Sequence, residues 1–285
     1  MKNLVFKVIC YLICLTVFSC SKDDFPEFNK IESARVITLI ADTPEVNPGA
    51  AVTITPVISD LQATTSPKDS VQVCIDTGIA FGAEPSCENN PSKSVLFSER
   101  ILTLPGGSDN WTGLADSFVV NIPSSTILFN QRSLQDQYNG INFLVEYIFY
   151  PSNSKAIKSL KRIVVSTNLK IQKNTNPLVS NIYSEGLPFT NLPLGASVNL
   201  TTDINSTSLE SYDQKLSDGT SRALQEDLTT TWFITDGKTK SARTVFQDSN
   251  LHTRPSESPI GRSSYIMAVV KDSRGGVGVV KKKLN

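Results

Sequence analysis

The segment Ser264-Tyr-Ile-Met-Ala-Val-Val270, followed by Lys271-Asp-Ser-Arg-Gly-Gly276 and Val277-Gly-Val-Val280, indicates the fold of this chain. Two apolar runs rich in β-branched residues flank six residues that are dense in turn formers. Runs of this composition form strands, and so short a connection joins antiparallel neighbours. We therefore expect the chain to end in a β-hairpin.

The same strand–turn–strand pattern recurs towards the N-terminus. Arg35–Ala41 and Ala51–Ile58 flank a turn-rich segment, and the apolar residues of the second run alternate with period two. Pro56 cannot donate to a strand ladder, so we expect that strand to bend there or to lie at an edge. Two strong apolar runs, Ile141–Tyr150 and Ala156–Thr167, predict a second hairpin.

Shorter runs predict the remaining strands, at Val71–Ile75, Ser94–Leu104, Ser117–Ile122, Leu178–Tyr183, Ala196–Leu200 and Leu228–Thr235. One helix is expected between Pro123 and Gly140, with Ser124 or Ser125 as its N-cap and Gly140 at its end. The polar stretch Thr201–Asp227 is expected to be a long loop.

These signatures resemble bacterial immunoglobulin-like domains and the related polycystic-kidney-disease-type domains. The closing hairpin matches their last two strands, and Trp232 resembles the buried tryptophan of their third strand. The resemblance implies an all-β fold with two tandem immunoglobulin-like β-sandwich domains, the first carrying a short helical insertion. The expected boundaries are a signal peptide at 1–19, a lipidated cysteine and tether at 20–33, domain 1 at 34–168, a linker at 169–177 and domain 2 at 178–285.

The first twenty residues predict export. Lys2 and Lys7 precede an apolar run of about a dozen residues, which is shorter than the roughly 20 that a membrane-spanning helix needs. The run ends at Leu15-Thr-Val-Phe-Ser-Cys20, which resembles the bacterial lipoprotein signal. That resemblance implies acylation of Cys20 and attachment to the outer membrane, with Ser21-Lys-Asp-Asp24 as either a surface-export signal or a solvated linker. A plain cleaved signal peptide is the alternative.

Cys10 and Cys14 leave with the predicted signal and Cys20 takes the lipid, so Cys74 and Cys87 remain as a pair. A pair of cysteines in an exported protein is expected to be oxidised. The disulfide would close a short loop without crossing the core, unlike the inter-sheet bridge of antibody domains. A metal or redox pair is the alternative, but CxxC spacing and nearby histidines are missing.

The sequence offers little catalytic chemistry. His252 is the one histidine and is expected in a solvated loop, so neither a zinc site nor a Ser-His-Asp arrangement is predicted. Glu226 and Asp227 are expected to point into water, which argues against paired-carboxylate catalysis. Asp236, Asp248 and Asp272 are isolated acids in turns, so a calcium ion between strand ends is only a minor alternative.

Composition excludes further classes. The chain has 285 residues and balances 27 basic against 27 acidic ones, so no global field would attract nucleic acid. We expect a non-catalytic outer-membrane or cell-surface lipoprotein, without cofactor, that acts as a binding or adhesion module for a protein or glycan partner. Its contact loops would be Cys74–Cys87 or Thr201–Asp227. The alternatives are a spacer or assembly subunit of an envelope complex and, with less support, a β-sandwich hydrolase acting on glycans.

Overall fold

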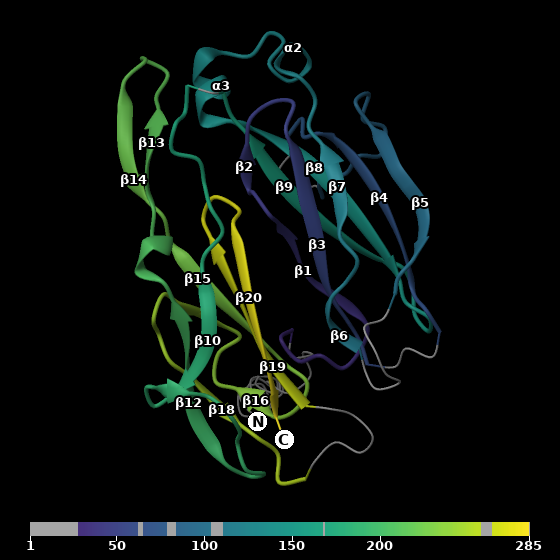
Figure 1. The fold of residues 1–285 in the computed structure, drawn as a ribbon, viewed down its shortest axis with the longest axis vertical. Coiled ribbons are helices and arrows are strands. Elements are labelled where there is room, and N and C mark those ends of the chain that lie inside the picture. Colours follow the sequence, from purple (N-terminus) through teal and green to yellow (C-terminus); the bar gives the residue numbers. More distant parts are fainter. Residues whose placement is uncertain are drawn as a thin grey trace, which may run out of the picture.

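The computed structural model describes residues 28–61, 65–78, 84–103, 111–167, 169–257 and 264–284 (Figure 1). Strands dominate the described residues and nearly all of them pair in antiparallel sheets, so the predicted all-β class with two sandwiches is confirmed. None of the described helices has the length and apolar character that a membrane span requires. The predicted signal peptide and the predicted lipid acceptor Cys20 lie outside the described residues.

The first β-sandwich, called sandwich 1 below, contains two sheets. One sheet has the order β1–β3–β6, with β7 also paired to β3. Its strands are β1 (Arg35–Ala41), β3 (Ala51–Asp60), β6 (Trp111–Leu114) and β7 (Phe118–Asn121). The other sheet has the order β2–β9–β8–β4–β5. Its strands are β2 (Glu45–Val46), β4 (Lys68–Ile75), β5 (Ser94–Ile101), β8 (Ile141–Tyr150) and β9 (Ile157–Val165).

Strand β3 lies inside its sheet, which corrects the expectation of an edge or a bend at Pro56. The strand pairs with β1 on one side along most of its length. On the other side β7 pairs with it up to Ile54, and β6 pairs with it from Val57 onward. Pro56 therefore lies where one partner strand ends and the next begins, so its missing N–H is not needed by either ladder.

The helical insertion of sandwich 1 is present but differs from the single helix that was expected. It consists of two short helices, α2 (Ser125–Leu128) and α3 (Leu134–Asn139). Ser124 is the N-cap of α2 without a side-chain bond, whereas the Ser133 side chain caps α3 by accepting from Asp136 N. Gly140 ends α3 at φ 93°, where a side chain would collide with Val164 and its neighbours.

The second β-sandwich, sandwich 2, also has two main sheets. One has the order β11–β10–β12–β18–β16 and contains β10 (Val179–Ser184), β11 (Leu187–Pro188), β12 (Ser197–Ile204), β16 (Lys238–Thr239) and β18 (Asn250–Thr253). The other has the order β17–β15–β19–β20 and contains β15 (Leu228–Ile234), β17 (Arg243–Val245), β19 (Ser264–Asp272) and β20 (Val277–Leu284). The closing hairpin predicted from the sequence is β19–β20.

Trp232 on β15 is fully buried in the core of sandwich 2, as its resemblance to the immunoglobulin-like tryptophan implies. Its indole Nε1 donates to Thr244 Oγ1 at 2.9 Å. Strand β15 ends just before Asp236–Gly237, a residue pair typical of hairpin turns. The chain instead passes there from one sheet to the other, because β16 pairs with β18 and not with β15.

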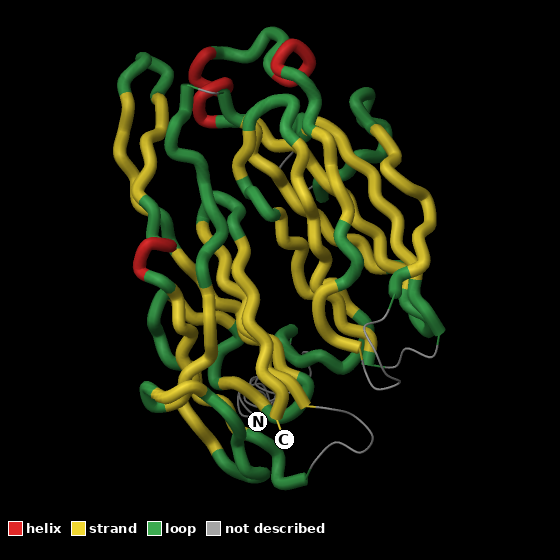
Figure 2. Tube along the Cα trace, viewed as in Figure 1, coloured by secondary structure: helices red, strands yellow, loops and turns green. Residues whose placement is uncertain are grey.

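The stretch Thr201–Asp227, expected to be a loop, is largely structured. It contains the end of β12, the 3-10 helix η1 (Ser206–Ser208) and a two-stranded hairpin of β13 (Ser211–Lys215) and β14 (Ser221–Gln225). The hairpin extends alongside sandwich 1 and reaches its helices (Figure 2). Asn139 of α3 donates to Lys215 O at 2.8 Å and accepts from Lys215 N at 2.8 Å.

The two sandwiches pack side by side along an interface that we call the seam. The sheet β1–β3–β6 faces the sheet β17–β15–β19–β20 across an apolar cluster of its own. The buried members of this cluster are Ile31, Ile37, Val57, Leu61, Phe233, Met267, Val269 and Val277. Strands β15 and β19 are therefore buried on both faces, one against their own sandwich and one against the other.

Residues near the N-terminus close one end of the seam. Ile31 N donates to Ile234 O at 2.6 Å, and Ile234 N donates to Asn29 O at 3.0 Å, which adds a short parallel bridge to β15. The Asn29 and Ile31 side chains are buried, and the Phe28 ring packs edge-on against Phe233. Residues 28–31, the first described part of the segment expected to be a tether, therefore dock on sandwich 2 before the chain enters β1.

Candidate functional site

The turn between β19 and β20 occupies the middle of the seam. Asp272 holds its shape: the carboxylate Oδ1 accepts from Arg274 N at 2.8 Å and from Gly276 N at 2.7 Å. The same oxygen accepts from Asn174 Nδ2 at 3.3 Å, which ties the segment between the sandwiches to the turn. Arg274 of this turn lies on one side of the seam, next to Glu45, and Asp272 and Gly275 lie on the other side, where they line a cavity.

On the first side, the Arg274 guanidinium contacts three carboxylates. The shortest N–O distances are 2.6 Å to Glu45 of β2, 3.1 Å to Glu226 and 3.4 Å to Glu210. Glu210 and Glu226 flank the β13–β14 hairpin at its base, and the guanidinium also lies 4.4 Å from the ring centre of Tyr212. One arginine therefore joins sandwich 1, sandwich 2 and the hairpin.

The pKa values of two carboxylates in this Arg274 cluster shift in opposite directions. Burial and the neighbouring Asp272 raise the pKa of Glu226 to about 7, although Arg274 opposes that rise. Burial would also raise the pKa of Glu45, but hydrogen bonds from Lys170 and Ser166 outweigh it and the pKa is lowered. The Lys170 ammonium lies 2.7 Å from Glu45 Oε1, so Glu45 contacts two cations. Among the described residues, Arg274 is the one cation that pairs with Glu226.

On the second side of the turn, the seam contains a cavity of about 290 Å³. We call it the seam cavity. Its lining includes apolar side chains of both sandwiches together with Pro85 of the disulfide-bonded loop. The charged residues that line it are Lys161, Arg162, Lys271 and Asp272.

Lys161 of β9 is the buried cation of the seam cavity. Only 7% of the residue is exposed, and its ammonium donates to Gly275 O at 2.5 Å. Burial lowers the pKa of Lys161 to about 8; Asp272 acts against this decrease, and the like charge of Lys271 adds to it. Lys161 lies two and four residues before Ile163 and Val165, so it is on the same, inward face of β9. The alternation of the strand could therefore have predicted that this lysine is buried.

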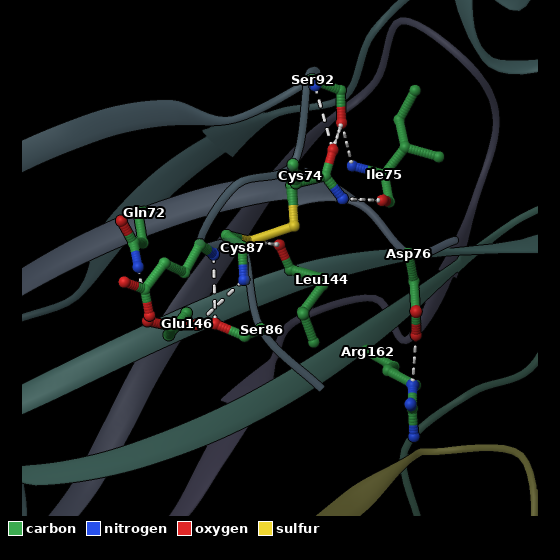
Figure 3. Close-up of a disulfide and its surroundings, with 12 residues drawn as sticks. Gln72, Cys74, Ile75, Asp76, Ser86, Cys87, Ser92, Leu144, Glu146 and Arg162 are labelled. Carbon is green, nitrogen blue, oxygen red and sulfur yellow. Dashed lines mark hydrogen bonds and ion pairs between the residues drawn. A yellow bond between two sulfur atoms is a disulfide. The ribbon is translucent and has the colours of Figure 1, made fainter. Parts of the chain in front are cut away.

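The surroundings of the disulfide include Leu144 and Arg162, two residues that also line this cavity (Figure 3). Cys74 of β4 is bonded to Cys87, and both are fully buried in a small cluster with Leu144, apart from the main core of sandwich 1. The bridge therefore stabilises a loop locally, as expected from the sequence. Residues 79–83 of that loop lie outside the described residues.

Glu146 organises the polar side of the same loop. Its carboxylate accepts from Cys87 N at 3.1 Å, from Ser86 Oγ at 3.2 Å and from Gln72, and it pairs with Lys158 at 3.1 Å (Figure 3). Burial would raise the pKa of Glu146, but these bonds lower it. The loop is thus held by one covalent bond and one saturated carboxylate.

Large aliphatic side chains are exposed around the helices at the end of sandwich 1. Ile127 of α2 is 60% exposed and Leu134 of α3 is 78% exposed. Leu169 and Ile171, which follow β9, are 77% and 95% exposed, and Leu169 lines a hollow together with residues of both helices. These four residues are called the distal patch.

His252 is the first of two site predictions that the structure corrects. It lies in β18 and is fully buried, not solvated in a loop. Burial lowers its pKa, and the nearby Asp236 carboxylate opposes that shift. Asp236 is itself buried, accepts from Ser264 Oγ at 2.8 Å and lies 3.6 Å from Arg254. The group is a polar part of the interior of sandwich 2.

Glu226 and Asp227 were both expected to point into water, and the structure contradicts this for Glu226. Asp227 is exposed, but Glu226 is buried at the seam and bound to Arg274. Asp272 is also buried, whereas Asp248 lies exposed in a turn. Within the described ranges, no three His, Cys, Asp or Glu side chains gather as a metal site would require.

Comparison with known proteins adds little about function. No family model matches the chain, and no curated protein matches its sequence. The adhesin InvE of Yersinia pseudotuberculosis is 8% identical, with a TM-score of 0.24, over 87% of this chain and 58% of the adhesin. The transglutaminase of red sea bream is 8% identical, with a TM-score of 0.26, over 90% of this chain and 32% of the enzyme.

A third similar structure is the D0–D1 domain of intimin, which is 11% identical over 87% of this chain and 98% of that domain, with a TM-score of 0.22. This chain spans less than two thirds of the adhesin and of the transglutaminase. Identities and TM-scores this low carry no argument about activity or partners.

Proposed function

We propose that this protein is an exported, non-catalytic binding module that is attached to the outer membrane through acylated Cys20 and binds a partner protein with the distal patch. The exposure of Ile127, Leu134, Leu169 and Ile171 carries the proposal. Single exposed aliphatic side chains are ordinary, and this protein has others, such as Ile101 and Leu187. Several on neighbouring segments, here α2, α3 and the segment after β9, are what mark a contact surface. Covering such side chains releases roughly 25 cal/mol per Å².

The position of the distal patch supports an anchored binding role. Helices α2 and α3 lie at one end of the long axis of the molecule, and β16 lies near the other (Figures 1 and 2). Asn29 bonds to Thr239 of β16 at 2.7 Å, so the chain enters the fold at the end opposite the helices. A lipid on Cys20 would therefore leave the distal patch facing away from the membrane.

The surroundings of the distal patch favour a rigid contact surface. Helix α3 is capped by Ser133 and Gly140 and is bonded through Asn139 to Lys215 of the β13–β14 hairpin. Thr167 N donates to Gln137 O at 2.9 Å, which holds the start of the following segment against α3. A surface that is ordered before binding loses less conformational entropy when a partner docks.

The test compares variants of the soluble mature chain, residues 20–285 with Cys20→Ala, immobilised and exposed to envelope and extracellular-matrix fractions. We expect a stoichiometric partner that Ile127→Ser/Leu134→Ser binds at least about tenfold more weakly, because both side chains would be central to the contact. The matched control is Val245→Ser, which changes a residue of β17 that is 59% exposed. Equal binding by both variants would place the contact elsewhere.

Anchoring is tested separately in cells. Mass analysis of the wild type should show an acylated N-terminus that Cys20→Ala lacks. Protease added to intact cells should cleave the protein if the patch faces outward, whereas protection would direct the partner search to the periplasm. An unmodified N-terminus in the wild type would contradict the lipid anchor and leave the binding test unaffected.

A further inference from the structure

Polar contacts tie the β13–β14 hairpin to the rest of the molecule near its two ends (Figure 1). We call residues 210–226 the arm. No strand residue of the arm is buried, and a cavity of about 230 Å³ lies between β13 and sandwich 1. A segment that buries so little opens at a lower free-energy cost than the core strands do.

The far end of the arm docks on α3 through Lys215. Its N–H donates to Asn139 Oδ1 at 2.8 Å, and its carbonyl accepts from Asn139 Nδ2 at 2.8 Å and from Gln135 Nε2 at 3.1 Å. Its ammonium lies 5.1 Å from the centre of the Tyr138 ring. Helix α3 has only six residues, and so short a helix depends on tertiary contacts for its order. The closed arm therefore supports the helix that carries Leu134 of the distal patch.

The base of the arm holds a carboxyl group in a poor position for a negative charge. Glu226 Oε1 lies 3.1 Å from the Arg274 guanidinium, which also binds Glu45 and Glu210. Glu226 Oε2 is buried and has no partner among the described residues. Opening of the arm would connect the cavity beside Arg274 to bulk water and hydrate this cluster. Ionised Glu226 is thus better solvated when the arm is open.

The pKa of Glu226 reflects this difference in solvation. It is raised to about 7, first by burial and then by Asp272, and in an open arm it would return towards 4.5. Closing of the arm is therefore most favoured below pH 4.5, and that advantage is lost as pH rises to about 7. The titratable and charged groups around Glu226 are Glu210 and Tyr212 of the arm, Asp227, Asp272 and Arg274 of the β19–β20 turn, Glu45 and Lys161 of sandwich 1, and Lys170 and Lys173.

We propose that the arm is a pH-sensitive strap, which closes on α3 while Glu226 is protonated and opens when Glu226 ionises, and which thereby regulates the distal patch. The regulation of the patch rests on the function proposed above, whereas the motion of the arm does not. The hinge is the base of the arm, where Glu226 N donates to Glu210 O at 3.0 Å. Strands β13 and β14 pair along their whole length, so the arm moves as one unit.

The experiment measures amide hydrogen exchange by NMR in the soluble mature chain between pH 5 and pH 8, with each rate corrected for the intrinsic rate at that pH. The Lys215 amide is the reporter, because it donates across the contact with α3. We expect its protection to fall at least about tenfold from pH 5 to pH 8, since each unit of pKa difference permits a tenfold change. The Gly140 amide, which donates to Asp136 O at 2.8 Å within α3, should lose protection with it.

The variant Glu226→Gln carries an uncharged side chain of the same shape, so it should keep the Lys215 amide protected at both pH values. The matched control is Glu88→Gln, which removes an exposed carboxylate from the disulfide-bonded loop and should respond to pH as the wild type does. The Leu216 amide donates to Thr220 O at 2.9 Å inside the arm and should stay protected throughout.

Constant protection of Lys215 in the wild type overturns the proposal. An equal fall in Glu226→Gln overturns the role of Glu226, and an equal fall at Leu216 means that the arm unfolds and does not move as one unit. A fall at Lys215 without one at Gly140 overturns the regulation of the patch. Failure to find a partner for the distal patch would contradict the proposed function and leave the motion of the arm unaffected.

Discussion

Sandwich 1 and sandwich 2 are built from the same kind of strands but bury their side chains differently. Sandwich 1 encloses one continuous core between its two sheets, and the Cys74–Cys87 disulfide holds a loop to β4 in a small cluster outside that core. Sandwich 2 has a smaller core around Trp232, and a buried polar group that includes His252 and Asp236 occupies part of its interior. One face of its central strands, β15 and β19, is buried only by the contact with sandwich 1 at the seam.

Two domains predicted as a tandem pair therefore need not be equally stable when separated from each other. Phe233, Met267 and Val269 of sandwich 2 would be exposed without sandwich 1 and residues 28–31. Burying an apolar side chain of this size contributes about 1.5–3 kcal/mol. Damage to the seam should therefore destabilise sandwich 2 first, and damage to the disulfide should act on sandwich 1.

The largest effect is expected from Arg274→Ala. The substitution leaves Glu226 buried without its cation and removes one of the two cations of Glu45, so we expect a loss of about 3–5 kcal/mol. Urea unfolding measures the loss, and hydrogen exchange should show faster exchange in β15 and β19 than in β8. Arg222→Ala, which removes an exposed side chain bonded only to Gln214 within the described residues, is the control. Similar losses for both variants would contradict the dependence of sandwich 2 on the seam.

The double substitution Cys74→Ala/Cys87→Ala tests the other side of the comparison. The loop that the bridge closes spans a sequence separation of 13, so chain entropy predicts a loss of about 3 kcal/mol. Here hydrogen exchange should increase in β4 and β8 and remain unchanged in β19. Faster exchange throughout both sandwiches would mean that they unfold as one unit and that the comparison fails.

Gly278→Ala examines how closely the connecting segment approaches β20. A Cβ at residue 278 would lie 2.3 Å from Pro177 O, which is backbone and cannot move aside freely. We expect a loss of about 2 kcal/mol from this overpacking, measured by thermal unfolding. Gly113→Ala is the matched control, because its Cβ would meet only the end of the Lys281 side chain at 3.5 Å. A stable Gly278→Ala protein would show that the seam adjusts more easily than expected.

The smallest effect is a change in pH dependence from Glu226→Gln. The pKa of Glu226 is raised in the folded state from 4.5 to about 7, so folding favours the protonated carboxyl. Its contribution to stability is therefore present below pH 4.5 and is lost as pH rises to about 7. The Gln variant should lack this decline when unfolding free energies are measured across that range. An identical slope in both proteins would mean that Arg274 keeps Glu226 ionised throughout.

Much of the fold could be predicted because alternation and turn chemistry act locally. The hairpins β8–β9 and β19–β20, the burial of Trp232 and the local nature of the disulfide all followed from short stretches of sequence. The β13–β14 hairpin was missed because Ser211–Gln225 is polar on both faces, so no period appears. Its order comes from contacts at its two ends, with α3 and with Arg274.

The candidate sites were harder to predict, since their residues come from distant parts of the chain. Lys161 and Asp272 are separated by the whole of the connecting segment and most of sandwich 2, and only the seam brings them to one cavity. Two local signals did exist. Lys161 alternates in register with the inward-facing residues Ile163 and Val165, which indicates a buried lysine. The unbroken apolar run Met267-Ala-Val-Val270 indicates a strand that is buried on both faces.

The sequence by itself predicted most of the strands, the closing hairpin and the cysteine pair, because each depends on residues that are close along the chain. The predicted export signal lies outside the described residues and stays a prediction. Tertiary structure alone decided that Glu226 and His252 are buried, that residues 28–31 dock on β15 and that the two sandwiches share a seam. Burial of a charged residue depends on which surfaces meet, and that is set by the summed packing of many distant side chains and not by the local pattern around it.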